Sequence, residues 1–164
     1  MPVISSNSLE FISLSAEQTT RLGMRLGKII QAGMLICLAG ELGSGKTTFV
    51  KGLAAGWGSF DTVLSPTFQL VNEYTSPDHK KLFHLDTYRL ESLLEAEELD
   101  IDNMLNYGAV AVEWADKIEE ILPIKRLWVQ LDHLDETRRT MIFSAIGDEY
   151  QNLLEKFRKM SFAR

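Results

Sequence analysis

Short apolar runs recur along the chain and predict the strands of a sheet. The purest runs, residues 34–39 and 109–112, contain no charged side chain, which is typical of parallel strands buried on both faces. Residues 9–12 predict a first strand, and residues 127–131 and 140–145 predict two strands on either side of a polar turn. The pattern therefore predicts a mixed sheet with a buried parallel part.

A hairpin is predicted in the middle of the chain. Residues 68–74 alternate loosely between apolar and polar side chains, and residues 81–86 form the next apolar run. A Ser-Pro-Asp turn signal at residues 76–78 separates the two runs. Residues 63–68 are expected to form a loop, because Pro66 has no N–H for a strand ladder and biases the preceding residue away from helix.

Helical spacing appears first after a capping box made by Ser15 and Gln18, and this helix is expected to end near Gly33. The apolar residues on its inner face are Leu22, Leu26, Ile29 and Ile30. A second helix is predicted directly after residue 47. The residues that share one of its faces are Phe49, Val50, Leu53 and Ala54.

Three more helices are predicted in the second half of the chain. Residues 90–99 form an acidic amphipathic segment, and residues 115–122 form a short segment that Pro123 stops. Residues 147–160 predict a final helix, whose inner face carries Tyr150, Leu153, Leu154 and Phe157. Helices that alternate with apolar strands indicate an α/β protein.

Composition and charge limit the number of domains, the cell compartment and the partners that the sequence predicts. The 164 residues predict a single domain at residues 1–164, with the helix at 147–160 as an appendage. No apolar run approaches the ~20 residues that span a bilayer, and the start of the chain lacks the features of a signal peptide. The lone cysteine, Cys37, lies in an apolar run, so we expect a cytoplasmic protein that contacts no membrane. The net charge of −6 argues against strong binding of nucleic acid by this chain alone.

Residues 40–47 read Gly-Glu-Leu-Gly-Ser-Gly-Lys-Thr and match the phosphate-binding P-loop pattern. Glycines let the backbone point its N–H groups at phosphate oxygens, Lys46 reaches the β- and γ-phosphates, and the Thr47 hydroxyl binds Mg²⁺. The preceding strand and following helix supply the order that the motif requires. The predicted contacts to the nucleotide are Glu41, Leu42, Gly43, Ser44, Gly45, Lys46, Thr47 and Thr48.

The motif and the order of elements together predict a P-loop NTPase-like three-layer fold. Its central sheet should be mixed and partly parallel, with helices on both faces. The expected ligands are a nucleoside triphosphate and Mg²⁺.

Two acids follow apolar runs and are expected at the carboxyl edge of the sheet, where ligands of open α/β sheets bind. Asp86 ends residues 81–86, and Glu113 follows residues 109–112. Glu113 is favoured as the Mg²⁺ carboxylate because its strand is the purer one, and Asp86 then acts as base or second metal-shell group. The opposite assignment, with Asp86 on Mg²⁺ and Glu113 as the base, stays open. With Lys46, these acids are the candidate catalytic residues.

Other polar residues could join the site. The segment Ser65-Pro66-Thr67-Phe68 stands about twenty residues after Lys46, where P-loop enzymes often place a loop that senses the γ-phosphate. The alternative is that this segment is a plain turn without a role in binding phosphate. His84 is expected to be a hydrogen-bonded interior group and not the base. Arg89 is either an ion-pair partner or a stabiliser of charge during transfer.

The P-loop, the Ser-Pro-Thr-Phe segment, the run His-Leu-Asp-Thr-Tyr-Arg-Leu at 84–90 and Glu113-Trp114 occur in the order of the TsaE family. Over residues 9–147 the chain resembles these bacterial P-loop ATPases of tRNA threonylcarbamoyladenosine synthesis. The resemblance implies ATP hydrolysis that resets a complex with TsaD and TsaB, which contact the tRNA. It links Thr47 and Glu113 to Mg²⁺, makes Asp86 an essential acid and puts Trp114 beside the site.

The same resemblance suggests contacts to the nucleoside at two further places. One is the helix start at Ser15 and Ala16, and the other is the hairpin that carries Arg138 and Arg139. Apart from the resemblance, the hydroxyl of Thr67 on the Pro-stiffened loop is a further candidate contact to the nucleotide. The basic C-terminal tail lies outside the part of the chain that resembles the family.

Three other classes of protein fit the P-loop less well. A small nucleotide or metabolite kinase usually needs an arginine-bearing lid over the phosphates. The only adjacent arginines in the sequence are Arg138 and Arg139, and no insertion for binding an acceptor is apparent. A regulatory GTPase would carry an Asn-Lys-x-Asp motif, which is absent from the sequence. Asp86 and Glu113 argue against a nucleotide-stabilised scaffold without turnover.

Overall fold

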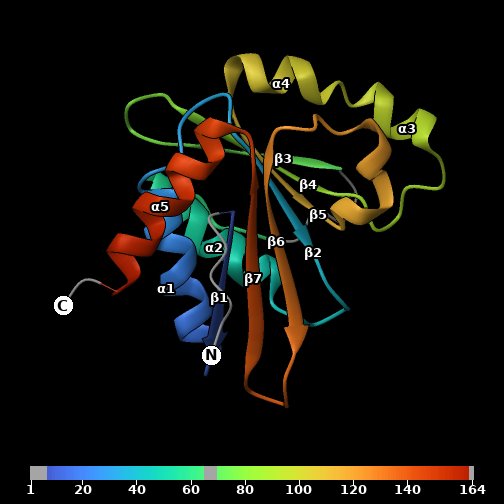
Figure 1. Ribbon diagram of the computed structural model, residues 1–164. Coiled ribbons are helices and arrows are strands. Elements are labelled where there is room, and N and C mark those ends of the chain that lie inside the picture. The colour runs from blue at the N-terminus through green and yellow to red at the C-terminus, as the bar shows by residue number, and fades with distance from the viewer. Residues whose placement is uncertain (1–6, 65–69, 163–164) are drawn as a thin grey trace.

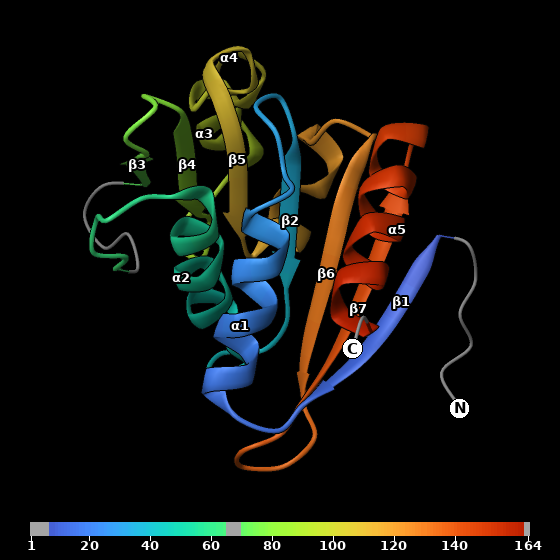
Figure 2. The ribbon, with the colours of Figure 1, turned by 90° about the vertical axis from the view of Figure 1, so that its left-hand side faces the viewer.

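The computed structural model describes residues 7–64 and 70–162, and within these ranges seven strands form one mixed sheet. The strands are β1 (Ser8–Ser13), β2 (Leu35–Ala39), β3 (Val71–Thr75), β4 (Lys81–Asp86), β5 (Gly108–Glu113), β6 (Arg126–His133) and β7 (Arg139–Ile146). Their order is β1-β7-β6-β2-β5-β4-β3, which Figure 2 shows from one edge to the other. Strands β4, β5, β2 and β6 pair in parallel, while β3, β7 and β1 pair with their neighbours in antiparallel fashion.

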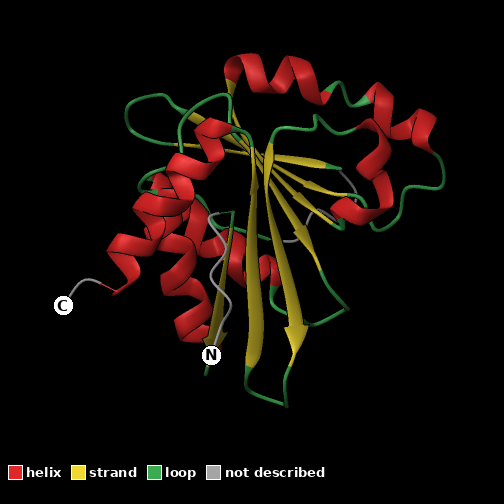
Figure 3. Cartoon of the chain, in the orientation of Figure 1, coloured by secondary structure: helices red, strands yellow, loops and turns green. Residues whose placement is uncertain are grey.

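Helices cover both faces of this sheet (Figures 1 and 3). The helices are α1 (Ala16–Gly27), α2 (Lys46–Trp57), α3 (Leu93–Glu98), α4 (Ile101–Tyr107), the 3₁₀ helix η1 (Ala115–Ile121) and α5 (Asp148–Phe162). Helices α1, α2 and α5 pack on one face, and α3, α4 and η1 pack on the other. The predicted three-layer α/β fold is therefore confirmed. None of the helices in the described ranges is long and apolar enough to cross a membrane.

Alternate residues of the central strands enter two separate cores. In β2, Ile36 and Leu38 belong to the core under α1, α2 and α5, whereas Leu35 and Cys37 belong to the core under α3, α4 and η1. Side chains point to opposite faces of a strand in turn, so a strand covered on both sides must be apolar at every position. This requirement explains the uninterrupted apolar runs of β2 and β5.

The C-terminal helix α5 takes part in the first of these cores. The four residues predicted for its inner face are its buried residues. Phe157 packs against Phe143 of β7 with ring centroids 4.9 Å apart. The Tyr150 hydroxyl accepts a hydrogen bond from the backbone N–H of Leu35 at 2.8 Å. Helix α5 thus supports the strand that leads into the P-loop.

Helices α1 and α2 touch through their backbones. A Cβ atom on Gly52 of α2 would lie 2.1 Å from the carbonyl oxygen of Thr20, and one on Gly23 of α1 would lie 2.4 Å from that of Phe49. Only glycine permits this approach, because any side chain would push the helices apart. The contact places the start of α1 beside the start of α2, where the P-loop ends.

The structure differs from the sequence prediction in the length of several helices. Helix α1 ends at Gly27 and not near Gly33, because the chain turns back toward β2. Ile30 is still buried after the turn, so the apolar spacing continues beyond the helix itself. The segment predicted as residues 115–122 forms a 3₁₀ helix, interrupted by non-helical dihedral angles at Ile118.

The acidic segment at 90–99 also differs. Its helix α3 begins only after Ser92, whose side chain accepts a hydrogen bond from the N–H of Glu95. Asp100 adopts a left-handed conformation with φ of 53°, which ends α3 and caps the next helix. That helix, α4, is absent from the sequence prediction, because only Ile101 of its residues is buried and the apolar signal is weak.

Cys37 provides a simple test of the packing. Burial raises the pKa of its thiol to about 12, so the thiol stays protonated at neutral pH and does not act as a nucleophile. We expect a maleimide or iodoacetamide reagent to leave the native protein unmodified and to modify it once in urea, as measured by mass spectrometry. Rapid alkylation of the native protein would contradict the buried position of β2.

The contact between the two helices predicts the effect of Gly52→Ala. Alanine normally stabilises a helix relative to glycine by about 1 kcal/mol, but here its methyl group would meet the backbone of α1. We expect the free energy of unfolding to fall by about 2 kcal/mol in a urea titration. The control is Ala55→Gly at an exposed position of α2, which should cost only about 1 kcal/mol. A more stable Gly52→Ala variant would contradict the close approach.

Candidate functional site

The P-loop connects β2 to α2 at the carboxyl edge of the sheet. Gly45 caps α2 in a left-handed conformation with φ of 105°, and the helix begins at Lys46. Gly40 lies against the neighbouring strand, where a Cβ atom would stand 1.9 Å from the carbonyl oxygen of Leu131. The loop therefore keeps the compact form that a phosphate-binding loop needs, with the N-terminus of α2 facing the site.

Lys46 lies folded over this loop. Its ammonium group donates hydrogen bonds to the carbonyl oxygens of Gly40 at 2.7 Å and Glu41 at 2.9 Å. The same nitrogen lies 4.0 Å from the ring centroid of Trp114, a favourable cation–π geometry. Burial lowers the pKa of Lys46, while the nearby carboxylates of Glu113 and Asp86 act in the opposite direction. The Lys46 side chain thus lies against the loop, and the charges of both acids act on it.

The two strand-end acids meet at the same edge of the sheet. Asp86 and Glu113 are direct neighbours in the parallel register of β4 and β5. The Thr47 hydroxyl donates to the Glu113 carboxylate, with distances of 2.8 and 3.0 Å to its two oxygens. Asp86 accepts a hydrogen bond from the backbone N–H of Tyr88 at 3.0 Å. The first turn of α2 and the ends of two strands therefore converge on one point.

These groups line a cavity of about 210 Å³. Its lining residues are Leu42, Gly43, Gly45, Lys46, Thr47, Thr48, Asp86, Glu113 and Trp114. The cavity combines one ammonium group, two threonine hydroxyls and two carboxylates. This set of groups suits the phosphate end of a nucleotide together with a hard cation.

The oxygen donors fit Mg²⁺ in particular. Mg²⁺ prefers one or two carboxylates, completed by water and phosphate oxygens, to an all-protein cage. Thr47 and Glu113 supply such a partial set, with Asp86 close by. In the two described stretches, no group of three or more His, Cys, Asp or Glu side chains forms a complete metal cage. The residues thus suit a cation that arrives with a phosphate group.

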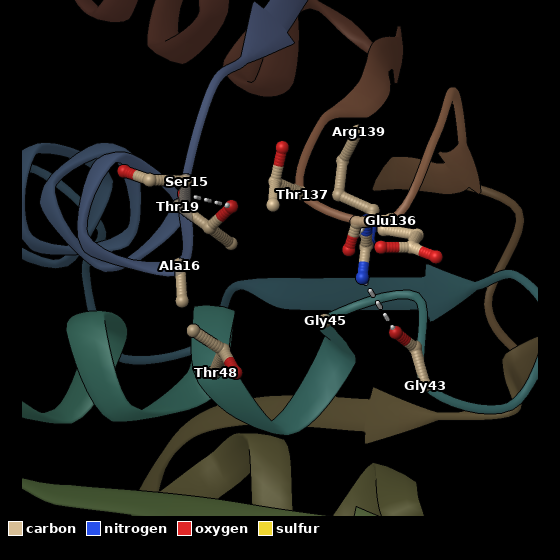
Figure 4. Close-up of a pocket in the computed structure, with 9 residues that line it drawn as sticks. All are labelled: Ser15, Ala16, Thr19, Gly43, Gly45, Thr48, Glu136, Thr137 and Arg139. Atoms are coloured by element: carbon tan, nitrogen blue, oxygen red, sulfur yellow. Dashed lines mark hydrogen bonds between the residues drawn. The ribbon is translucent and has the colours of Figure 1, made fainter.

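A second cavity, of about 280 Å³, lies next to the first, and Figure 4 shows the residues that line it. Both cavities share Gly43, Gly45 and Thr48, so together they form one groove that passes over the P-loop. The remaining lining residues come from the start of α1 and from the hairpin between β6 and β7: Ser15, Ala16, Thr19, Glu136, Thr137 and Arg139. The contact between α1 and α2 sets the width of this groove.

The hairpin is held against the P-loop by two side chains. Arg139 donates to the carbonyl oxygen of Gly43 at 3.2 Å, as Figure 4 shows, and His133 donates to that of Leu42 at 3.2 Å. Arg138 instead pairs with Asp135, with 2.6 Å between Nε and Oδ2. Arg138 lies in the turn that precedes β7, and of the two arginines only Arg139 lines the groove. A role of Arg138 in binding nucleotide stays a prediction, and the geometry favours Arg139.

The other predicted site residues are placed as follows. Ser15 lines the groove while its hydroxyl accepts from the N–H of Gln18 at 3.2 Å, which forms the predicted helix cap. Thr67 and the rest of the Ser-Pro-Thr-Phe segment lie outside the described residues. Trp114 adopts a left-handed conformation with φ of 58° and packs on Tyr88 with ring centroids 4.8 Å apart.

His84 is more closely tied to the site than the sequence suggests. It is buried, as predicted, and both ring nitrogens have partners. Nδ1 lies 2.8 Å from the Tyr74 hydroxyl, and Nε2 lies 2.5 Å from Oε2 of Glu113. His84 stands two residues before Asp86 in β4, so the two side chains share one face of the strand. Its link to Glu113 depends on the pairing of β4 with β5, which the sequence does not state.

A P-loop that opens a helix, faced by acids at the ends of parallel strands, defines a P-loop-type α/β protein. Comparison with known proteins makes the assignment narrower. Residues 13–141 match the family described as threonylcarbamoyl adenosine biosynthesis protein TsaE. This chain belongs to the TsaE family.

Individual relatives agree with this assignment. The chain is 36% identical to the tRNA threonylcarbamoyladenosine biosynthesis protein TsaE of Bacillus subtilis, over 90% of this chain and 92% of the relative. It is 39% identical to the protein of that name from Streptomyces coelicolor, over 79% of this chain and 91% of the relative. The crystal structure of Bacillus subtilis YdiB superposes with a TM-score of 0.78 at 32% identity and covers 94% of this chain and 96% of that one.

Proposed function

We propose that this protein is a Mg²⁺-dependent ATPase that acts in the threonylcarbamoyl modification of adenosine in tRNA. The observation that carries the proposal is the cavity in which Lys46 and Thr47 of the P-loop face Asp86 and Glu113. The names of the relatives supply the pathway. We further propose that the protein works in the cytoplasm with TsaD and TsaB, and that it meets tRNA only through them.

ATP is the nucleotide that we assign to the groove. Its phosphates would lie at the N-terminus of α2, where free backbone N–H groups and the helix dipole favour negative charge. Lys46 would exchange its present carbonyl partners for β- and γ-phosphate oxygens. The nucleoside would occupy the larger cavity, between the start of α1 and the hairpin that carries Arg139.

The acids divide the chemistry between them. Thr47 and Glu113 would hold Mg²⁺, which when bound neutralises charge on the phosphates. Asp86 lines the same cavity and would orient the attacking water and accept its proton. Lys46 stabilises the charge that develops on the transferred phosphoryl group. We therefore propose that the phosphoryl group is transferred to water, which needs no binding site for a second substrate.

Dependence on partners follows from charge and from the family. A chain with a net charge of −6 repels a polyanion such as tRNA, so basic partner proteins would have to supply the contact surface. We propose that ATP hydrolysis resets the complex with TsaD and TsaB between cycles of modification. Hydrolysis by the isolated chain would then be slow and would rise when the partners bind.

Mixing the purified proteins tests this proposal. We expect phosphate release by the isolated chain to be weak and to increase at least several-fold when TsaD and TsaB are added. Association should also depend on ATP in a co-purification experiment. Transfer of phosphate to a nucleoside monophosphate by the isolated chain would support a kinase instead. Absence of any nucleotide-sensitive association would reject the partnership.

Asp86→Asn tests the role of the base. The amide keeps the size of the side chain but cannot accept a proton, so we expect kcat for ATP hydrolysis to fall about 100-fold or more while ATP still binds. Phosphate release and calorimetric titration measure the two quantities. The control is Asp78→Asn in the exposed turn between β3 and β4, which should leave both unchanged. Full activity of Asp86→Asn would reject Asp86 as base.

The two adjacent arginines give a test of the nucleoside cavity. Arg139→Ala removes the side chain that lines the groove and holds Gly43, and we expect ATP affinity to fall about tenfold, or about 1.4 kcal/mol. Arg138→Ala breaks only an exposed ion pair and should change affinity less than about twofold. Calorimetry on both variants decides between them. The opposite ranking would place the nucleoside elsewhere.

A further inference from the structure

Side chains from four elements form one continuous hydrogen-bonded chain behind the phosphate cavity. Tyr74 of β3 bonds to His84 of β4, His84 bonds to Glu113 of β5, and Glu113 accepts from Thr47 of α2. The relative exposures of Tyr74, His84 and Glu113 are 2%, 0% and 3%. Buried polar chains of this kind hold their members rigidly when every group is satisfied.

Donors and acceptors match along this chain. A carboxylate only accepts, so Nε2 of His84 must carry the proton that bonds to Glu113. Nδ1 of the same ring then offers a lone pair to the Tyr74 hydroxyl. Burial raises the pKa of Tyr74, which keeps this hydroxyl a donor. The direction of every hydrogen bond is therefore defined, and all of them point toward Glu113.

The sheet register explains why His84 can reach this position. Its neighbour on β5 is Ala111, and Glu113 follows two residues later on the same face. The small side chain of Ala111 leaves space for the imidazole ring above the strand. Tyr74 lies diagonally across from His84 on β3, since its own partner on β4 is Leu82. Three adjacent strands thus each contribute one member.

We propose that His84, held by Tyr74, is a positioning residue that fixes the Glu113 carboxylate beside Thr47 for the binding of Mg²⁺ with the nucleotide. This proposal rests on the proposed function. Glutamate has three rotatable side-chain bonds, and the hydrogen bond from Nε2 removes much of this freedom before the cation arrives. Neither His84 nor Tyr74 lines the phosphate cavity, so both act through Glu113.

The proposal separates two parts of nucleotide binding. The P-loop backbone and Lys46 bind the phosphates without any help from His84. Only the gain in affinity that Mg²⁺ brings depends on the orientation of Glu113. A purely structural role of His84 would instead weaken both parts together.

Calorimetric titration with a non-hydrolysable ATP analogue, in EDTA and then in saturating Mg²⁺, measures these two parts. For His84→Phe, which keeps a ring but has no donor, we expect the gain from Mg²⁺ to fall about tenfold, with affinity in EDTA unchanged. His84→Gln retains an N–H that can reach Glu113 and should restore most of the gain. Tyr74→Phe should reduce it about threefold.

Tyr150→Phe is the matched control, since it removes a buried hydroxyl outside the site and should leave the Mg²⁺ effect unchanged. An undiminished gain in folded His84→Phe overturns the proposal, as does an equal loss of affinity in EDTA. If His84→Phe does not fold by circular dichroism, Tyr74→Phe decides, and a wild-type gain in that variant overturns the proposal.

The histidine tautomer gives a second readout that is independent of nucleotide. In ¹⁵N NMR spectra of the whole protein we expect His84 to carry its proton on Nε2, and a proton on Nδ1 alone would overturn the proposal. Failure of the wild-type protein to bind the analogue in either condition would instead reject the proposed function, while the NMR result would still test His84.

Discussion

The carboxylate of Glu113 is the group on which the arrangement of the site depends. A buried carboxylate is costly unless it is hydrogen-bonded, and Glu113 satisfies this requirement with Thr47 on one side and His84 on the other. The first donor ties the start of α2 to the sheet, and the second ties β4 to β5 beyond their backbone ladder. One side chain therefore joins the P-loop, the helix and two strands at the edge where the cavities open.

Close backbone contacts assemble the rest of the groove around this point. The glycines of α1 and α2 bring Ser15 to the wall of the larger cavity, and the hairpin between β6 and β7 reaches the P-loop through Arg139 and His133. The helix contact requires glycine on both helices, and the hairpin contact requires side chains that donate to P-loop carbonyl oxygens. The walls of this groove therefore belong to separate elements of the fold.

Much of the fold could be predicted from apolar spacing. Strands β2 and β5 are buried on both sides and have uninterrupted apolar runs, and α5 presents the four predicted residues to the core. The prediction of helices was wrong where apolar spacing was weak, or where it continued beyond the end of the helix. Helix α4 buries a single residue, and Ile30 is buried in a turn after α1 has already ended. Apolar spacing reports burial, and it reports helix length only indirectly.

The sequence by itself determined the P-loop, the strand-end acids and the family, because each depends on residue types at short spacing along the chain. The tertiary structure decided which of these residues meet. Pairing of β4 with β5 sets Asp86 beside Glu113 and joins His84 to the site, and the hairpin between β6 and β7 directs Arg139, not Arg138, toward the groove. Register and facing arise only when distant segments pair, since the hydrogen bonds that define them connect residues far apart in the chain.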